Sequence, residues 1–203
     1  MENDSGNELL VVWDEARGHI ERGEYDKAIE IYKYVLLRYA DDPVASEYAS
    51  AYVGDVLLTT RRLELAERYL KKAIGYAPQK PHYHYLLGFT HSVMRRFWPA
   101  IREFKVALGL EPNNAEYERG LGWAVFESGE RQDGLAHLYR AQKLLPTDVN
   151  ILTDLAAAML IMGNINKARE YGKKAIAIDP ENTLVRGLLE NADRINRLKK
   201  KQA

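Results

Sequence analysis

The sequence of 203 residues contains no cysteine, no excess charge of either sign and no long hydrophobic run. The absence of cysteine excludes disulfide bonds, thiolate metal sites and a cysteine nucleophile, and it fits a cytoplasmic protein. Lys plus Arg and Asp plus Glu each number 29, so bulk charge does not favour nucleic acid as a partner. The apolar run over residues 9–13 is too short for a secretory signal, and no other run is long enough to span a membrane. These absences predict a cytoplasmic protein with no nucleic-acid partner and no membrane span.

A repeat of 34 residues organises most of the chain. Four prolines stand at this interval: Pro78, Pro112, Pro146 and Pro180. The segments that end on them are alike, as AERYLKKAIGYAP (66–78) and AREYGKKAIAIDP (168–180) show. An earlier copy over residues 28–40 fits the same frame without the proline, and the frame then slips by four residues around Pro43. Self-similarity at a fixed period of this length predicts a repeat protein.

Five units aligned in this frame share columns of small residues. Two such columns lie twelve positions apart, namely Ala16, Gly54, Gly88, Gly122 and Ala156, and Ala28, Ala66, Ala100, Gly134 and Ala168. Small side chains at these positions let two antiparallel helices cross closely. Between the columns lies a turn position, held by Gly23, Arg61, Arg95, Gly129 and Gly163. Because apolar residues recur at spacings of three and four and no segment alternates with period two, each unit is predicted to be a helical hairpin, and no sheet is expected.

This pattern resembles the tetratricopeptide repeat (TPR) family, whose units have 34 residues and a proline near the end of the second helix. The resemblance covers residues 9–182. It implies an all-α fold, a right-handed α-solenoid of five TPR-like helical hairpins plus a C-terminal capping helix. The expected parts are a disordered acidic N-terminus (1–8), five TPR units (9–42, 47–80, 81–114, 115–148 and 149–182) and a capping helix with a basic tail (183–203).

The C-terminal segment 183–203 does not repeat the hairpin pattern. We expect its apolar residues to form one stripe that covers the last unit, made of Leu184, Leu188, Ile195 and Leu198. Six basic residues against two acidic ones leave this segment with a net charge of +4. The basic residues either form a solvated outer face or contact an acidic partner or a membrane surface. In the preceding unit, Gly172 stands where the other units have a large residue.

The sequence offers no assembled catalytic or metal site. His82 and His84 are two residues apart, so on a helix they point in different directions and cannot share an ion. His91 falls in a column that faces the hairpin interior, so a packed imidazole is the alternative to a metal ligand. There is no phosphate-binding glycine loop and no Ser/His/acid set at a usable spacing. We therefore predict a protein that is not an enzyme and that uses no metal and no cofactor.

The first helices of the hairpins carry the columns expected to line a concave groove. In the TPR family this face holds peptides or segments of partner proteins. The expected groove residues are Trp13, Arg17, Tyr48, Tyr52, Asp55, His82, Tyr85, Phe89, Arg119, Trp123, Phe126 and Asp154. Exposed aromatic side chains are typical binding anchors, although neighbouring first helices can bury some of them. The Lys, Arg and Asn clamp with which some family members hold a C-terminal carboxylate is missing.

Acidic residues outnumber basic ones in the expected groove. They are Asp14, Glu21, Asp55, Glu116, Glu127 and Asp154, against Arg17 and Arg119. The sequence therefore predicts a non-enzymatic TPR adaptor or scaffold, a monomer or weak homo-oligomer, that binds an apolar or amphipathic protein or peptide segment with basic flanks. The alternative is a homo-oligomeric assembly protein that self-associates through the solenoid ends or outer face. Trp98, at the tip of the third hairpin, is either a second contact point or folds back on its own unit.

Overall fold

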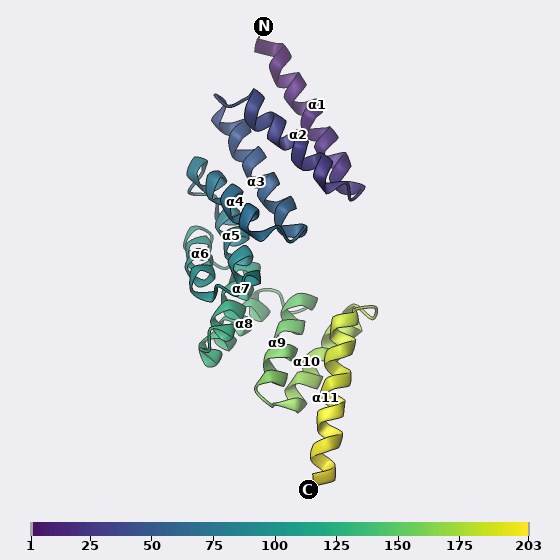
Figure 1. Cartoon of the computed structure of the whole chain (residues 1–203). Helices are drawn as coiled ribbons and strands as arrows, with labels where there is room; N and C mark the ends of the chain where they lie inside the picture. Colours follow the sequence, from purple (N-terminus) through teal and green to yellow (C-terminus); the bar gives the residue numbers. More distant parts are fainter. Residues whose placement is uncertain (1, 203) are drawn as a thin grey trace. The chain divides into compact units, whose positions relative to one another are not determined.

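The computed structural model describes the backbone of residues 2–202 and the side chains of residues 8–198. Within this range the chain forms eleven α-helices and no strand (Figure 1). Two compact units divide it, Met1–Leu110 (unit 1) and Glu111–Ala203 (unit 2).

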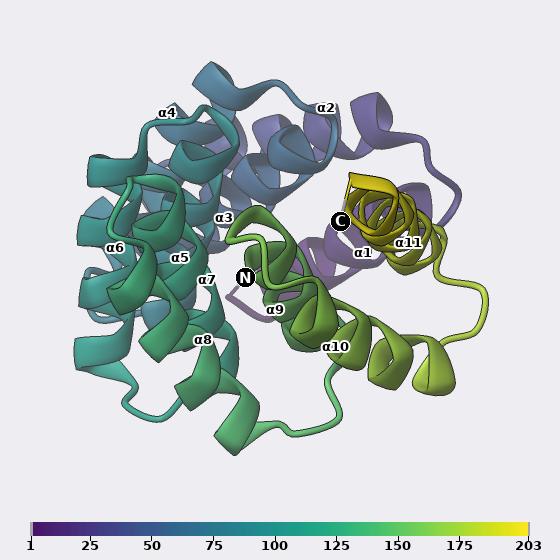
Figure 2. The same ribbon diagram turned by 90° about the horizontal axis from the view of Figure 1, so that it is seen from below.

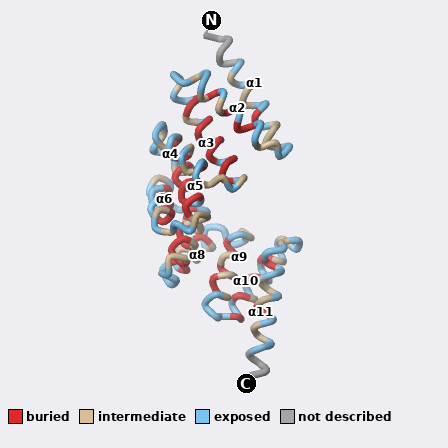
Figure 3. Tube along the Cα trace, viewed as in Figure 1, coloured by how far each residue is buried: buried red, intermediate tan, exposed pale blue. Residues whose placement is uncertain are grey.

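Unit 1 consists of three helical hairpins. Their helices are α1 (Glu2–Glu21), α2 (Tyr25–Arg38), α3 (Pro43–Thr59), α4 (Leu63–Tyr76), α5 (Pro81–Val93) and α6 (Phe97–Leu110). Figure 2 shows α4 and α6 on one side of the unit and α3 and α5 on the other. Buried positions are concentrated along α3 and α5, which are covered by other helices on several faces (Figure 3).

Unit 2 consists of two hairpins and a final helix. Its helices are α7 (Ala115–Glu127), α8 (Arg131–Leu144), α9 (Val149–Ile161), α10 (Ile165–Ile178) and α11 (Thr183–Gln202). The last three hairpins begin at residues 81, 115 and 149, where the repeat frame places the start of each unit. The predicted fold class, an all-α solenoid of five TPR-like hairpins followed by a C-terminal helix, is confirmed.

Each hairpin turn contains one residue in the left-handed backbone region. These residues are Gly23, Arg61, Arg95, Gly129 and Gly163, with φ between 57° and 108°. They are the five residues of the predicted turn column. A left-handed residue ends a helix and reverses the chain, and glycine adopts this conformation without strain. The column therefore marks the turns even in the two units where arginine replaces glycine.

The small-residue columns mark close helix crossings. An ideal Cβ placed on Gly134 of α8 would lie 2.5 Å from the backbone nitrogen of Phe126 in α7. A Cβ on Gly122 would lie 2.9 Å from the carbonyl oxygen of Gly134. In the second hairpin the space beside Gly54 is filled instead by the Leu70 side chain, 2.7 Å from the Cβ position. Glycine at these positions therefore lets the paired helices approach each other more closely than alanine would allow.

Two helices begin earlier than the sequence indicated. The structure places residues 2–8 in α1, whereas we expected them to be disordered. No proline interrupts this stretch, so the helix extends into it with one more hydrogen bond for each added residue. Helix α3 starts at Pro43 instead of residue 47, because the Asp42 carboxylate accepts hydrogen bonds from the backbone nitrogens of Val44 and Ala45 at 2.9 and 3.0 Å.

Helix α11 packs on the last hairpin through a different stripe from the one predicted. Leu184 is 74% exposed and Leu198 is also exposed, whereas Val185 and Ala192 are buried. The prediction was therefore wrong for two of its four residues, because the packed face is rotated by about one residue. Leu189 of α11 fills the space beside Gly172, with its Cδ2 atom 2.8 Å from where a Cβ would lie. The missing large side chain at Gly172 thus makes room for the final helix.

Two consecutive hairpins contain a histidine–glutamate pair with its partners exchanged, and the pair is buried in the first hairpin and half-buried in the second. In α5 and α6, His84 Nδ1 lies 2.9 Å from the Glu103 carboxylate. In α7 and α8, the acid is Glu118 and the imidazole is His137, at 2.6 Å. Each pair joins residues 19 apart in the sequence, at equivalent positions of the repeat. An imidazole and a carboxylate therefore link the two helices of both hairpins, whichever helix supplies each group.

Candidate functional site

Three adjoining hollows run along the first helices of unit 1. The first, between α1 and α3, has a volume of about 130 Å³. The other two lie between α3 and α5 and have volumes of about 290 and 280 Å³. Tyr52 lines the first and second hollows, and Asp55 and Leu86 line the second and third. Because neighbouring hollows share lining residues, they form one groove, which we call the unit 1 groove.

Aromatic rings form two clusters along this groove. Trp13 and Tyr52 lie with ring centroids 5.8 Å apart, and both pack on Tyr32, a buried residue of α2. Burial raises the pKa of the Tyr32 hydroxyl to about 12. The second cluster is on α5, where Tyr85 lies 6.1 Å from His82 and 6.4 Å from Phe89, measured between ring centroids. The exposed rings offer flat apolar area to a ligand.

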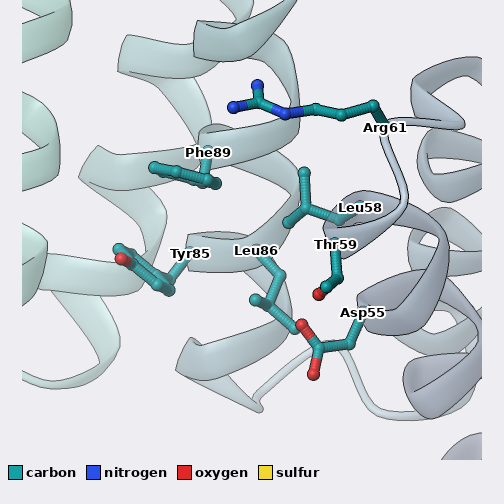
Figure 4. A pocket seen from close by; sticks show the side chains of 7 residues that line it. All are labelled: Asp55, Leu58, Thr59, Arg61, Tyr85, Leu86 and Phe89. Atoms are coloured by element: carbon teal, nitrogen blue, oxygen red, sulfur yellow. The ribbon is translucent and has the colours of Figure 1, made fainter. Parts of the chain in front are cut away.

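Asp55 lies between the two aromatic clusters. It comes from α3 and faces Leu86 of α5 across the third hollow, with Tyr85 and Phe89 further along the same wall (Figure 4). Burial raises the pKa of its carboxyl, and the neighbouring His82 opposes this shift. No ion pair to Asp55 is present among residues 8–198. A carboxylate that has lost water without gaining a cation is a favourable contact for a lysine or arginine of a ligand.

Two cations that the predicted groove columns did not include border this groove. Arg61 comes from the turn after α3 and extends across the third hollow above Phe89 (Figure 4). Lys80 precedes α5, and its Nζ atom lies 5.9 Å from the centroid of the exposed Tyr48 ring. Arg17, in turn, forms an exposed ion pair with Asp14 at 2.8 Å. The acidic character of the unit 1 groove is therefore concentrated at Asp55.

Two of the aromatic residues expected to be exposed anchors are buried. Tyr85 is 7% exposed, because its ring packs on Phe104 of α6 with centroids 5.8 Å apart. Phe126 is 2% exposed and belongs to a core cluster with Leu135 of α8 and Leu155 of α9. The prediction that Phe126 lines a groove was therefore wrong, because its column faces the next hairpin. Tyr85 lines the third hollow but exposes little of its surface there.

In unit 2, two predicted groove residues contact each other. Arg119 of α7 donates a hydrogen bond to the Asp154 carboxylate of α9 at 3.0 Å and lies 3.8 Å from Glu116. Burial raises the pKa of the Asp154 carboxyl, and the Arg119 guanidinium opposes this shift. Trp123 is half-buried and stacks on Phe126 with centroids 5.7 Å apart. Arg119 and Asp154 thus tie α7 to α9.

The histidines take part in helix packing. His84 is buried and contacts Glu103, and its Nε2 lies 3.1 Å from the Pro78 carbonyl oxygen. His91 is buried in the second half of α5, and burial lowers the pKa of its imidazole. Over residues 8–198, no three His, Asp or Glu side chains are grouped so that they could hold a metal ion. Sequence spacing missed the His84–Glu103 contact, although the separation of 19 residues recurs in the next hairpin.

The hairpins, their left-handed turns and the close crossings match a known repeat. A family model described as tetratricopeptide repeat matches residues 48–203. The chain belongs to the tetratricopeptide repeat family. None of the TPR helices in the described part of the chain is long and apolar enough to cross a membrane.

Known proteins similar to this TPR chain include one sequence relative and several solved structures. Bacteriophage adsorption protein A of Escherichia coli K12 is 30% identical over 114 residues, which are 56% of this chain and 11% of that protein. The chain therefore spans about a ninth of that relative. TTC0263, a TPR protein of Thermus thermophilus, is 20% identical with a TM-score of 0.74, covering 91% of this chain and 98% of its own. YrrB, described as a TPR protein with an unusual peptide-binding site, is 20% identical with a TM-score of 0.62, covering 84% and 86%.

Proposed function

We propose that this protein is a non-enzymatic TPR scaffold that holds a segment of a partner protein in the unit 1 groove. One observation carries the proposal: three adjoining hollows expose aromatic rings, and two of them share the Asp55 carboxylate, which has no ion-pair partner among residues 8–198. Pockets that bind peptides combine apolar area with a few polar groups that fix orientation. The family supports a role in protein interaction, and a peptide-binding site in YrrB supports a peptide as the ligand class.

The lining indicates which segment the groove would accept. Tyr48, Tyr52 and Phe89 are exposed, and they would contact large apolar side chains of the ligand. Such rings contribute contact area at a small cost in side-chain entropy. Asp55 would accept hydrogen bonds from one lysine or arginine placed between the apolar residues. The ligand is therefore an apolar or amphipathic segment with a basic residue, bound in an extended or helical form.

The apolar contacts would contribute most of the affinity. Asp55 would determine which ligand sequences bind, because it favours a lysine or arginine at one position. Truncating a well-buried aromatic anchor at an interface typically costs about 2 kcal/mol or more. Salt screens the contact with Asp55 but leaves the burial of apolar surface unchanged. Binding is therefore expected to weaken as salt rises without disappearing. Trp123, Arg119 and Asp154 remain proposed contacts in unit 2, where a ligand carboxylate or amide would have to compete with the Arg119–Asp154 ion pair.

Selection from a phage-displayed library of random peptides on the intact protein tests this proposal. We expect enrichment of sequences with aromatic or large aliphatic residues next to lysine or arginine. Synthetic versions of these peptides are then measured against the double variant Asp55→Asn, Phe89→Ala. Both substituted side chains are exposed, so circular dichroism is expected to show a folded protein.

The double variant is expected to lose at least about tenfold in affinity, which corresponds to roughly 1.4 kcal/mol. The matched control is Glu170→Gln with Tyr76→Ala, which removes one exposed carboxylate and one exposed ring from second helices. This control is expected to bind as the wild type does. Equal binding of every selected peptide by the folded double variant would overturn the proposed groove.

A further inference from the structure

Two further hollows lie on the opposite side of unit 1, on the second helices α2 and α4. One, of about 280 Å³, follows a single face of α4 and is lined by Leu65, Arg68, Tyr69 and Lys72. The other, of about 310 Å³, lies between α2 and α4 and is lined by Lys33, Leu36, Leu37, Tyr69 and Lys72. Tyr69 and Lys72 belong to both hollows. We call these seven residues the α2–α4 outer surface.

This surface is positively charged, and two of its cations have no partner in the described part of the chain. Among residues 8–198, no ion pair or hydrogen bond involves the side chains of Arg68 or Lys72. Lys33 contacts Glu30 at 2.9 Å. The nearby Glu67 carboxylate is already engaged by Lys71 and Arg96, at 2.5 and 3.0 Å. The lining itself contains three cations and no acidic residue.

The same surface exposes large apolar side chains. Leu37 is 82% exposed and Leu65 is 41% exposed, and both border the hollows. Burial of these exposed leucine side chains against apolar atoms of a partner would be favourable, because it removes apolar surface from water. Apolar contacts at the centre and charges at the rim are typical of protein-binding surfaces.

This combination is specific to the second hairpin. The residues equivalent to Arg68 are Glu30 in α2, Arg102 in α6, Ala136 in α8 and Glu170 in α10, and Arg102 contacts Glu103 at 3.3 Å. In α10, Lys174 occupies the position of Lys72, but it contacts Glu170 at 2.7 Å. The repeat frame alone therefore does not account for two unpaired cations beside Tyr69.

We propose that the α2–α4 outer surface binds an acidic amphipathic segment of a partner protein. Carboxylates of that segment contact Arg68, Lys72 and Lys33, and its apolar side chains enter the two hollows and cover Leu37 and Leu65. The charge of the surface selects the acidic ligand. The hollows favour a protein segment over an anionic membrane, because side chains can fill two concavities that the plane of a bilayer would leave open.

This site is independent of the unit 1 groove. The outer surface comes from the second helices α2 and α4, whereas the groove is lined mainly by the first helices α1, α3 and α5. The outer surface takes an acidic segment, and the unit 1 groove takes a segment with a basic residue. Occupation of one site therefore leaves the other open, and a single TPR chain can hold two partners of opposite charge.

The test is a peptide selection on a protein whose groove is disabled. A phage-displayed library of random peptides is selected on the full chain carrying Asp55→Asn and Phe89→Ala. We expect enrichment of peptides that combine aspartate or glutamate with leucine or aromatic residues. Their synthetic versions are measured by fluorescence anisotropy against the same protein with Arg68→Glu and Lys72→Glu added.

The added substitutions are expected to weaken binding at least about tenfold, because both cations then repel the ligand. The control is Lys173→Glu with Lys174→Glu on α10, which changes the net charge equally and is expected to retain binding. Leu37→Ser tests the apolar part and is also expected to weaken binding. All of these substituted positions are exposed, and circular dichroism checks folding.

Two results would overturn this proposal. One is equal binding of the selected peptides by the Arg68→Glu, Lys72→Glu protein and its control. The other is that no acidic peptide is enriched, while vesicles of phosphatidylserine and phosphatidylcholine bind the protein through Arg68 and Lys72. The second result would assign the surface to an anionic membrane.

Discussion

Replacing Gly134 with alanine adds one methyl group where α7 and α8 cross. The new Cβ would lie 2.5 Å from the Phe126 backbone nitrogen and 2.7 Å from the Gly122 carbonyl oxygen, whereas real Cβ atoms essentially never approach other atoms within 3.0 Å. Both obstacles are backbone atoms, so no side-chain rotation relieves the overlap. The two helices must separate, and the packing of Leu135 and Leu138 around the crossing loosens.

The size of the effect follows from two opposing contributions. Overpacking a tight core position costs about 1–3 kcal/mol. Alanine in a helix interior is favoured over glycine by about 0.5–1 kcal/mol. We therefore expect Gly134→Ala to lower the stability of unit 2 by about 1–2 kcal/mol.

Gly75→Ala in α4 is the matched control, because nothing lies within 4 Å of its Cβ position. This variant has only the helix-propensity gain and is expected to be more stable than the wild type. Thermal unfolding followed by circular dichroism compares the two variants. An equal rise in melting temperature for both would refute the close crossing of α7 and α8.

Three further predictions concern side chains that pack between helices. His91→Leu is expected to keep or raise stability, because His91 Nδ1 is buried without a hydrogen-bond partner among the described side chains. Burial lowers the pKa of His91, so the folded protein loses stability as pH falls below the unfolded-state pKa of about 6.5. The melting temperature of the leucine variant is expected to lack this contribution to the pH dependence. His84→Leu is expected to cost about 1–3 kcal/mol, because the buried Glu103 carboxylate loses its imidazole partner; adding Glu103→Leu is expected to recover part of the loss in urea unfolding, and no recovery would contradict the pairing. Leu189→Ala is expected to destabilise α11 by about 1–2 kcal/mol because it empties the space beside Gly172, whereas the exposed Leu184→Ala is expected to change the melting temperature little; equal effects would contradict the observed packed face.

The repeat frame predicted the parts of the fold that depend on local backbone geometry. The turn column identified the left-handed residue of each of the five hairpin turns, including Arg61 and Arg95. The small-residue columns identified crossings such as that of Gly122 and Gly134. These features are visible in the sequence because each repeats at a fixed position, and because the backbone at that position tolerates few alternatives.

Features that depend on contacts between hairpins were not visible in the same way. The groove columns did not distinguish the exposed Phe89 from the buried Phe126, because burial depends on which side chains the next hairpin contributes. Arg61 and Lys80 were not among the predicted groove residues, because they lie in connections, outside the groove columns of the first helices. The prediction misplaced the packed face of α11, because this helix lies outside the repeat and no repeat column indicates which of its faces contacts the last hairpin.

The unit 1 groove is tested most directly by the pH dependence of peptide binding at Asp55. A lysine-containing peptide selected on the intact protein is titrated against His82→Gln and against the double variant His82→Gln, Asp55→Asn. The histidine is removed from both proteins so that Asp55 is the only difference between them. Because burial raises the pKa of Asp55, its carboxylate takes up a proton at a higher pH than an ordinary aspartate.

We predict that affinity for the Asp55-containing protein falls as pH is lowered through this raised pKa, because a neutral carboxyl no longer attracts the lysine. The Asp55→Asn protein is expected to bind more weakly at neutral pH and to show no such fall. Its melting temperature at neutral pH is expected to equal or exceed that of its parent, because a carboxyl with a raised pKa costs stability when it is ionised, and the substitution removes this cost. Equal affinity and the same pH dependence in both proteins would contradict a contact between Asp55 and the ligand.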